Sequence, residues 1–94
     1  MSSNQKEKIM SIDQTITYLV AKKEPGNSNI EAIINLLIHY VQNTPIYFET
    51  EPFFCFGQII FTIVGEEKDQ KEFQEKIRID LDKFNGKLII LKEK

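Results

Sequence analysis

The residues of this 94-residue chain best suited to catalysis are its single histidine, its single cysteine and one closely spaced pair of glutamates. His39 would need an acid or a nucleophile at a fixed distance, and the spacing of the sequence supplies neither. Cys55 has no neighbouring lysine, arginine or histidine to lower the pKa of its thiol, so an inert thiol is expected. Glu49 and Glu51 fall on one side of a continuous strand, but paired acids catalyse proton transfer only where burial separates their pKa values. We therefore expect no enzyme activity.

The composition limits the cofactors and partners of the chain. A lone cysteine excludes an intramolecular disulfide, and no cysteine and histidine pair has the spacing of a metal site, so we expect no metal and no cofactor. The same observation favours an intracellular, reducing location such as the cytoplasm. No uncharged apolar run approaches the roughly 20 residues of a membrane-spanning helix. The 12 basic and 14 acidic residues are spread without long runs, which argues against a general nucleic-acid binder.

An aromatic cluster, Phe53, Phe54 and Phe56, is the least ordinary feature of the sequence. Three rings within four residues point to both sides of an extended chain, and only one side can enter a core. Large rigid rings dominate the energetics of protein interfaces. The cluster is therefore either a strand buried on both faces or an anchor for another protein.

The elements that position these residues follow from the hydrophobic pattern. Apolar residues recur at helical spacing over residues 30–42 and 73–84, which predicts two amphipathic helices. Ser28 lies three residues before Glu31 and predicts a capping box at the start of the first helix. Asn85-Gly86 predicts a left-handed cap after the second.

Segments rich in β-branched and aromatic residues predict strands at 46–50, at 53–64 and at 87–92. Residues 15–20 fit a strand by the same criterion, although residues 12–22 also fit helical spacing. A first strand completes the order βαββαβ, the ferredoxin-like split motif, in which a four-stranded antiparallel sheet carries both helices on one face. A first helix would instead give an α+β chain of order ααββαβ.

The domain organisation is simple. Residues 1–11 are polar and are expected to form a flexible tail. Residues 12–94 are expected to form a single α+β domain, because a chain of this length supports one hydrophobic core.

The sheet of such a fold has one face that no helix covers. Four consecutive aliphatic residues, Leu88 to Leu91, force two of them onto that face in either register. Contiguous apolar patches usually mark an interface. We therefore predict a small protein-interaction module that self-associates through its sheet as a homodimer, face to face or edge to edge, or serves as a small subunit of a larger complex. The interface residues predicted on this basis are Leu19, Phe53, Phe54, Ile60, Leu88 and Ile90.

The loop Glu24-Pro25-Gly26 after the first strand, together with the order of elements, resembles the ACT domains. Members of that family often carry an acidic or polar residue followed by Pro-Gly at this place, and they associate through their sheets to bind amino acids. The resemblance implies an alternative function, a regulatory domain that binds a small metabolite. It implies ligand contacts from Pro25, Gly26, Asn27 and Asn29.

The segment from Phe56 to Ile63, followed by an acidic turn and a helix, resembles the third strand of an RNA-recognition motif. That family stacks bases on aromatic residues at the third and fifth places of the strand, where this chain has Gln58 and Ile60. The resemblance implies the fold, and nucleic-acid binding is the least favoured of the three functions.

Overall fold

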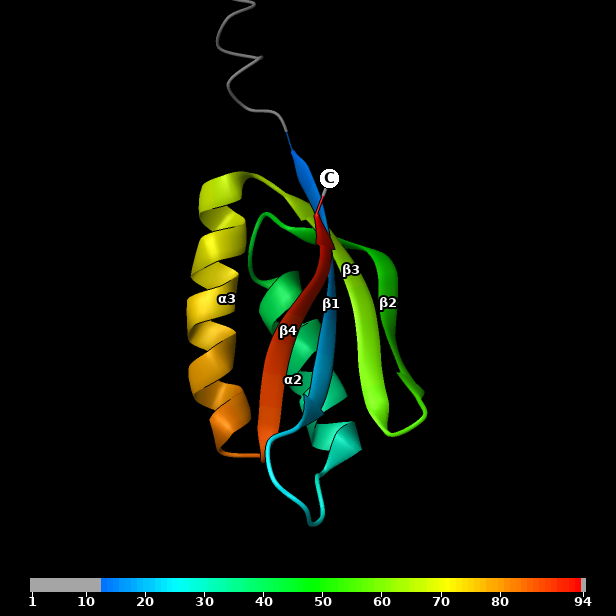
Figure 1. The fold of residues 1–94 in the computed structure, drawn as a ribbon. Helices are drawn as coiled ribbons and strands as arrows, with labels where there is room; N and C mark the ends of the chain where they lie inside the picture. The colour runs from blue at the N-terminus through cyan, green and yellow to red at the C-terminus, as the bar shows by residue number, and fades with distance from the viewer. Residues whose placement is uncertain (1–12, 94) are drawn as a thin grey trace, which may run out of the picture.

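The structure is a computed structural model that describes residues 13–93. Its elements are β1 (Gln14–Lys22), α2 (Ile30–Gln42), β2 (Tyr47–Cys55), β3 (Gln58–Gly65), α3 (Glu67–Asp82) and β4 (Gly86–Glu93). The strands form one antiparallel sheet of order β2-β3-β1-β4, and both helices pack against one face of it (Figure 1). This is the ferredoxin-like βαββαβ arrangement, so the predicted fold is confirmed. The tail predicted over residues 1–11 lies outside the described residues.

The ambiguous first segment forms a strand. β1 is central in the sheet, with β3 on one side and β4 on the other. Ile16, Tyr18 and Val20 point toward the helices and are buried in the core. Leu19, on the opposite face, is only 8% exposed because neighbouring strands flank it. The alternative of a helix over residues 12–22, with the order ααββαβ, is therefore wrong.

The long strand predicted over residues 53–64 divides into two strands. Phe56 and Gly57 connect them as a two-residue turn, with φ values of 50° and 80°. Positive φ at both positions is typical of the type I′ turn, whose twist matches that of a β-hairpin. Phe53 and Phe54 therefore belong to β2, which ends at Cys55, and not to β3.

The helix boundaries depend on two asparagines. Asn29, and not Ser28, is the N-cap of α2, because its Oδ1 accepts a hydrogen bond from the backbone N–H of Ala32 at 3.0 Å. The capping box predicted from Ser28 and Glu31 is therefore wrong: the cap lies one residue later, and Ala32 has no side-chain acceptor that could complete a box. Asn85 has φ of 59° between α3 and β4, so the left-handed conformation predicted there is confirmed.

Four aromatic rings join the helices to the central strands. Tyr18 of β1 stacks on Phe61 of β3 with ring centroids 5.4 Å apart. Phe73 of α3 meets Tyr18 edge-on at 5.3 Å, and Tyr40 of α2 meets Phe73 at 5.4 Å. Such edge-to-face contacts add stabilisation to the burial of apolar area. The core therefore lies on the helix side of the sheet.

One buried polar side chain, Gln70 of α3, is bonded at both ends. Its Oε1 accepts a hydrogen bond from the Tyr18 hydroxyl at 2.8 Å, and its Nε2 donates to the carbonyl oxygens of Gln14 and Ile63 at 3.1 and 3.0 Å. Gln74 donates to the same hydroxyl at 3.0 Å. Burial raises the pKa of Tyr18 to about 12, which keeps its hydroxyl protonated as a donor. This network fixes α3 against β1 and β3.

Candidate functional site

The face of the sheet opposite the helices carries one apolar side chain from every strand at the same height. Leu19 of β1 pairs with Ile60 of β3 and with Ile89 of β4, and Ile60 pairs in turn with Phe53 of β2. Ile60 and Ile89 are half-buried, and Phe53 is exposed. We call this face the open face and these four residues the apolar row. The apolar row crosses the full width of the sheet.

A second row of the open face runs beside the first. Thr17 pairs with Thr62, Thr62 pairs with Thr50, and Lys92 ends the row on β4. The hydroxyl oxygens of Thr17 and Thr62 lie 3.1 Å apart and form a hydrogen bond. Because these two hydroxyls bond to each other, a partner surface could cover them without leaving both unpaired.

The predicted placement of Leu88 and Ile90 at the interface is wrong. Leu88 and Ile90 pair with Val20 and Tyr18, which face the helices, and Leu88 is only 6% exposed. Both residues contact the core, so neither lies on the open face as the predicted interface required. Ile89 takes their place there. Four successive aliphatic residues have no alternation from which the register could be read.

The predicted interface residues that do lie on the open face are Leu19, Ile60 and Phe53. Phe54 pairs with Ile59, which belongs to the helix side of β3, yet Phe54 itself is exposed near the end of the hairpin. The contact of these residues with another protein stays a prediction.

Both edges of the sheet are poor templates for another strand. β2 shifts register twice against β3 and contains Pro52, which has no backbone N–H to donate. The pairing of β4 with β1 skips Leu91, and the strand then ends on Lys92 and Glu93. Bulges, proline and charged residues are the features that block edge-to-edge pairing in natural sheets. They favour a face-to-face contact over an edge-to-edge one.

The hairpin between β2 and β3 ends in two exposed rings, Phe54 and Phe56, which we call the aromatic tip. Phe56 is 97% exposed and holds a left-handed backbone conformation that favours glycine or asparagine. The expectation of a strand buried on both faces is therefore wrong for this cluster. Neither burial nor backbone preference accounts for an aromatic residue at position 56.

Replacing Phe56 with Asn is expected to raise the free energy of unfolding by about 1 kcal/mol, since asparagine tolerates the left-handed conformation better. Urea denaturation measures this difference. Phe56→Ala removes the ring but keeps a residue that disfavours positive φ, so it should change stability less. A loss of stability in Phe56→Asn would show that the ring stabilises the fold.

The loop after β1 borders a shallow hollow of about 460 Å³. Pro25, Gly26 and Asn27, three of the residues implied as ligand contacts, line it. The fourth, Asn29, does not line it and caps α2 instead. The other lining residues are Lys23, Glu24, Asp82, Lys83 and Asn85.

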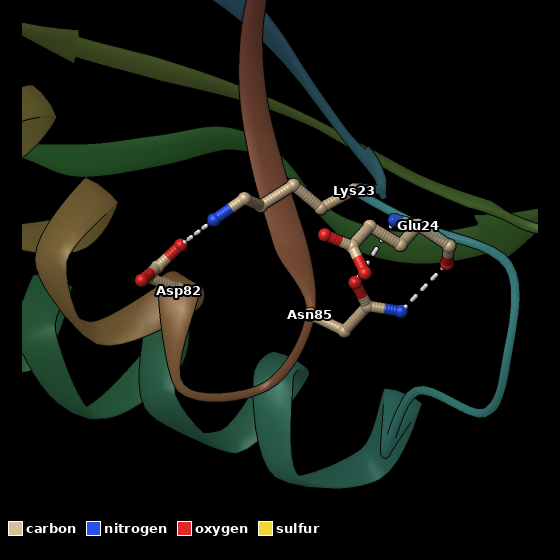
Figure 2. Close-up of polar contacts among 4 residues, drawn as sticks. All are labelled: Lys23, Glu24, Asp82 and Asn85. Atoms are coloured by element: carbon tan, nitrogen blue, oxygen red, sulfur yellow. Dashed lines mark hydrogen bonds and ion pairs between the residues drawn. The ribbon is translucent and has the colours of Figure 1, made fainter.

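Polar groups of this hollow are already paired with one another (Figure 2). The Oδ1 of Asn85 accepts a hydrogen bond from the backbone N–H of Glu24 at 2.9 Å, and its Nδ2 donates to the Glu24 carbonyl oxygen at 2.8 Å. Lys23 forms an ion pair with Asp82, and that hydrogen bond raises the pKa of the Lys23 ammonium. The Asn85 side chain thus fastens the loop to the turn between α3 and β4. The sequence pattern predicts only a capping role for Asn85.

Replacing Asn85 with Gly is expected to lower the free energy of unfolding by about 1 to 2 kcal/mol. Glycine keeps the left-handed backbone, so the loss reports mainly the two hydrogen bonds to Glu24. Asn85→Asp retains the acceptor but not the donor, so its free energy of unfolding in urea denaturation should lie between those of the natural chain and the glycine variant. A glycine variant as stable as the natural chain would show that the bonds to Glu24 contribute nothing.

The residues considered for catalysis are not gathered into one site. His39 of α2 lines a different hollow of about 500 Å³ together with the ion pair of Glu72 and Lys76, and neither Cys55 nor the β2 glutamates line it. Within residues 13–93, no three side chains of His, Cys, Asp or Glu are arranged to bind a metal ion. Neither α2 nor α3 has the length and apolar character needed to cross a bilayer.

Comparisons of the chain with protein-family models, with curated proteins and with solved structures found no match.

Proposed function

We propose that this chain is a non-enzymatic protein-interaction module that forms a homodimer through the open face of its sheet. The observation that supports the proposal is the apolar row, because every strand contributes one apolar side chain to it while both helices cover the other face. Full burial of an aliphatic or aromatic side chain is worth roughly 1.5 to 3 kcal/mol, and a monomer leaves part of that stabilisation unused. Phe53 of this row is exposed and Ile60 and Ile89 are half-buried, and a contiguous, partly exposed apolar patch of this kind usually marks an interaction site.

The dimensions of the sheet indicate how tight such a dimer would be. Four strands spaced about 4.8 Å apart, each about 26 Å long, present on the order of 500 Å² per copy. Two such faces bury about 1,000 Å², which is at the lower end for specific protein contacts. We therefore expect a reversible dimer with a dissociation constant in the micromolar range.

Nuclear magnetic resonance of the methyl groups tests which surface mediates the association. As the protein concentration rises, signals from the open face, those of Leu19, Ile60 and Ile89, should shift. The exposed methyl groups of Ile79 on α3 provide the control and should stay constant. Shifts confined to α3 would contradict association through the sheet.

The aromatic tip favours a second contact, with a different protein in a larger complex. Phe56 lies in the turn between two strands, and a fully exposed ring at a backbone conformation that disfavours it points to a role outside the fold. If the tip serves another partner, Phe56→Asn should leave the dimer unchanged.

The two alternative functions have less support. A small metabolite at Pro25, Gly26 and Asn27 would meet polar groups of Lys23 and Asn85 that are already bonded within the protein. Base stacking has less support, because among the described residues the central strands β1 and β3 present no aromatic side chain to the open face. A single free cysteine, Cys55, supports a reducing cytoplasmic location as part of this proposal.

A further inference from the structure

We propose, resting on the proposed self-association, that the two copies are related by a two-fold axis parallel to the strands. β2 of each copy then lies over β4 of its partner, and β3 lies over β1. A symmetric face-to-face pair has its axis in the plane between the two sheets, and aligned packing of the sheets places that axis either along the strands or across them. An axis along the strands places each edge strand over the opposite edge strand of the partner and keeps every row at the same position along the strands. An axis across the strands places each strand over the same strand of the partner and reverses the order of the rows.

The apolar row fits an axis along the strands. Rows keep their height under this operation, so the apolar row of one copy meets the apolar row of the other. Phe53 comes to face the partner's Ile89, and Ile60 comes to face the partner's Leu19. Each phenyl ring thus faces an aliphatic side chain, and the two central pairs are aliphatic on both sides. Two sheets packed in this way lie about 10 Å apart with their strands nearly aligned.

The charges at the two edges select the same axis. β2 carries Glu49 and Glu51 and no basic residue, whereas β4 carries two lysines, Lys87 and Lys92, and one acid, Glu93. Exchanging the edges brings the acidic strand opposite the basic one. Placing each strand over its own copy would instead bring lysine strand over lysine strand. Complementary charges favour one docked orientation and disfavour the other.

The positions of these charges along the strands also fit an axis parallel to the strands. Glu49 is adjacent to Thr50, which belongs to the row that Lys92 ends on the opposite edge. An axis along the strands keeps this row at its height. It therefore brings the Glu49 segment close to the partner's Lys92.

The native cysteine allows a direct test by cross-linking. Cys55 pairs with Gln58, and Lys87 pairs with Ala21. Continuing the β1 and β3 register by one residue aligns Gln58 with Ala21, so Cys55 and Lys87 end one row at opposite edges. The proposed axis brings Cys55 over the partner's Lys87. An axis across the strands brings Cys55 toward the partner's Tyr47, at the far end of β2.

The experiment compares Lys87→Cys with Tyr47→Cys, both at exposed positions, after treatment with a bismaleimide that spans about 10 Å. We expect Lys87→Cys to give a covalent dimer in at least several-fold higher yield than Tyr47→Cys and the natural chain. A higher or equal yield from Tyr47→Cys, in a protein that light scattering shows to be dimeric, would overturn the arrangement and leave self-association standing. A monomeric protein without cross-links in either variant would overturn both the proposed axis and the self-association on which it rests.

Discussion

Ile60→Lys is expected to weaken self-association at least about 100-fold. Ile60 lies in the middle of the open face beside Leu19 and Phe53, whereas its sequence neighbours Ile59 and Phe61 point into the core. The change removes an aliphatic contact worth roughly 1.5 kcal/mol or more from each copy, and two copies make it about 3 kcal/mol. Sedimentation velocity over a range of concentrations measures the shift in dissociation constant.

Ile79→Lys is the matched control for this substitution. Ile79 lies on α3, away from the open face, and is 66% exposed, so the same change of side chain should leave the dimer intact. Circular dichroism should show unchanged helix content in both variants. A dimeric Ile60→Lys variant would exclude the open face as the interface, and an unfolded one would show that Ile60 is needed for the core.

Gln70→Leu is expected to lower the free energy of unfolding by about 3 kcal/mol. Gln70 is 0% exposed, and leucine would remove the acceptor of the buried Tyr18 hydroxyl as well as the donor to the carbonyl oxygens of Gln14 and Ile63. Each buried polar group left unpaired costs about 1 to 3 kcal/mol. Urea denaturation of both proteins at neutral pH measures the difference.

The matched control is Gln74→Leu, one helical turn further along α3. Gln74 is half-buried and makes one hydrogen bond, to the Tyr18 hydroxyl, which keeps Gln70 as its other partner. The loss should stay below about 1 kcal/mol. Equal losses in the two variants would contradict the role given to Gln70.

The fold could be predicted because its local signals agree with one another. Residues 30–42 and 73–84 have helical periodicity, and Asn85 provides the left-handed residue that the turn before β4 requires. Residues 15–20 fit both a strand and a helix by pattern alone. Only the completed βαββαβ order decided between them, which shows that global consistency can resolve a local ambiguity.

The parts that could not be predicted depend on tertiary pairing. The turn at Phe56 carries an aromatic side chain in place of the usual asparagine, so the sequence pattern predicts one continuous strand. The four aliphatic residues Leu88 to Leu91 allow either register, and pairing with β1 selects the one that buries Leu88. The buried bonds of Gln70 join residues far apart in the chain, and nothing in its helical surroundings marks it as different from Gln74.

An uncovered apolar face of the sheet was predicted, but only some of the residues that form it were predicted correctly. Period-two alternation placed Ile60 correctly because polar Gln58 and Thr62 flank it at the same face of β3. Leu88 and Ile90 were misplaced because β4 has no such polar markers between them. Alternation therefore predicts a face only where polar residues interrupt the apolar ones.

The molar mass in solution tests the central claim most directly. Light scattering on the eluting protein, from micromolar to near-millimolar loading, should show a mass that rises from 11.0 kDa toward twice that value. The rise should be reversible on dilution and should be lost in Ile60→Lys but not in Ile79→Lys. A mass that stays at 11.0 kDa at the highest concentration would contradict self-association through the open face.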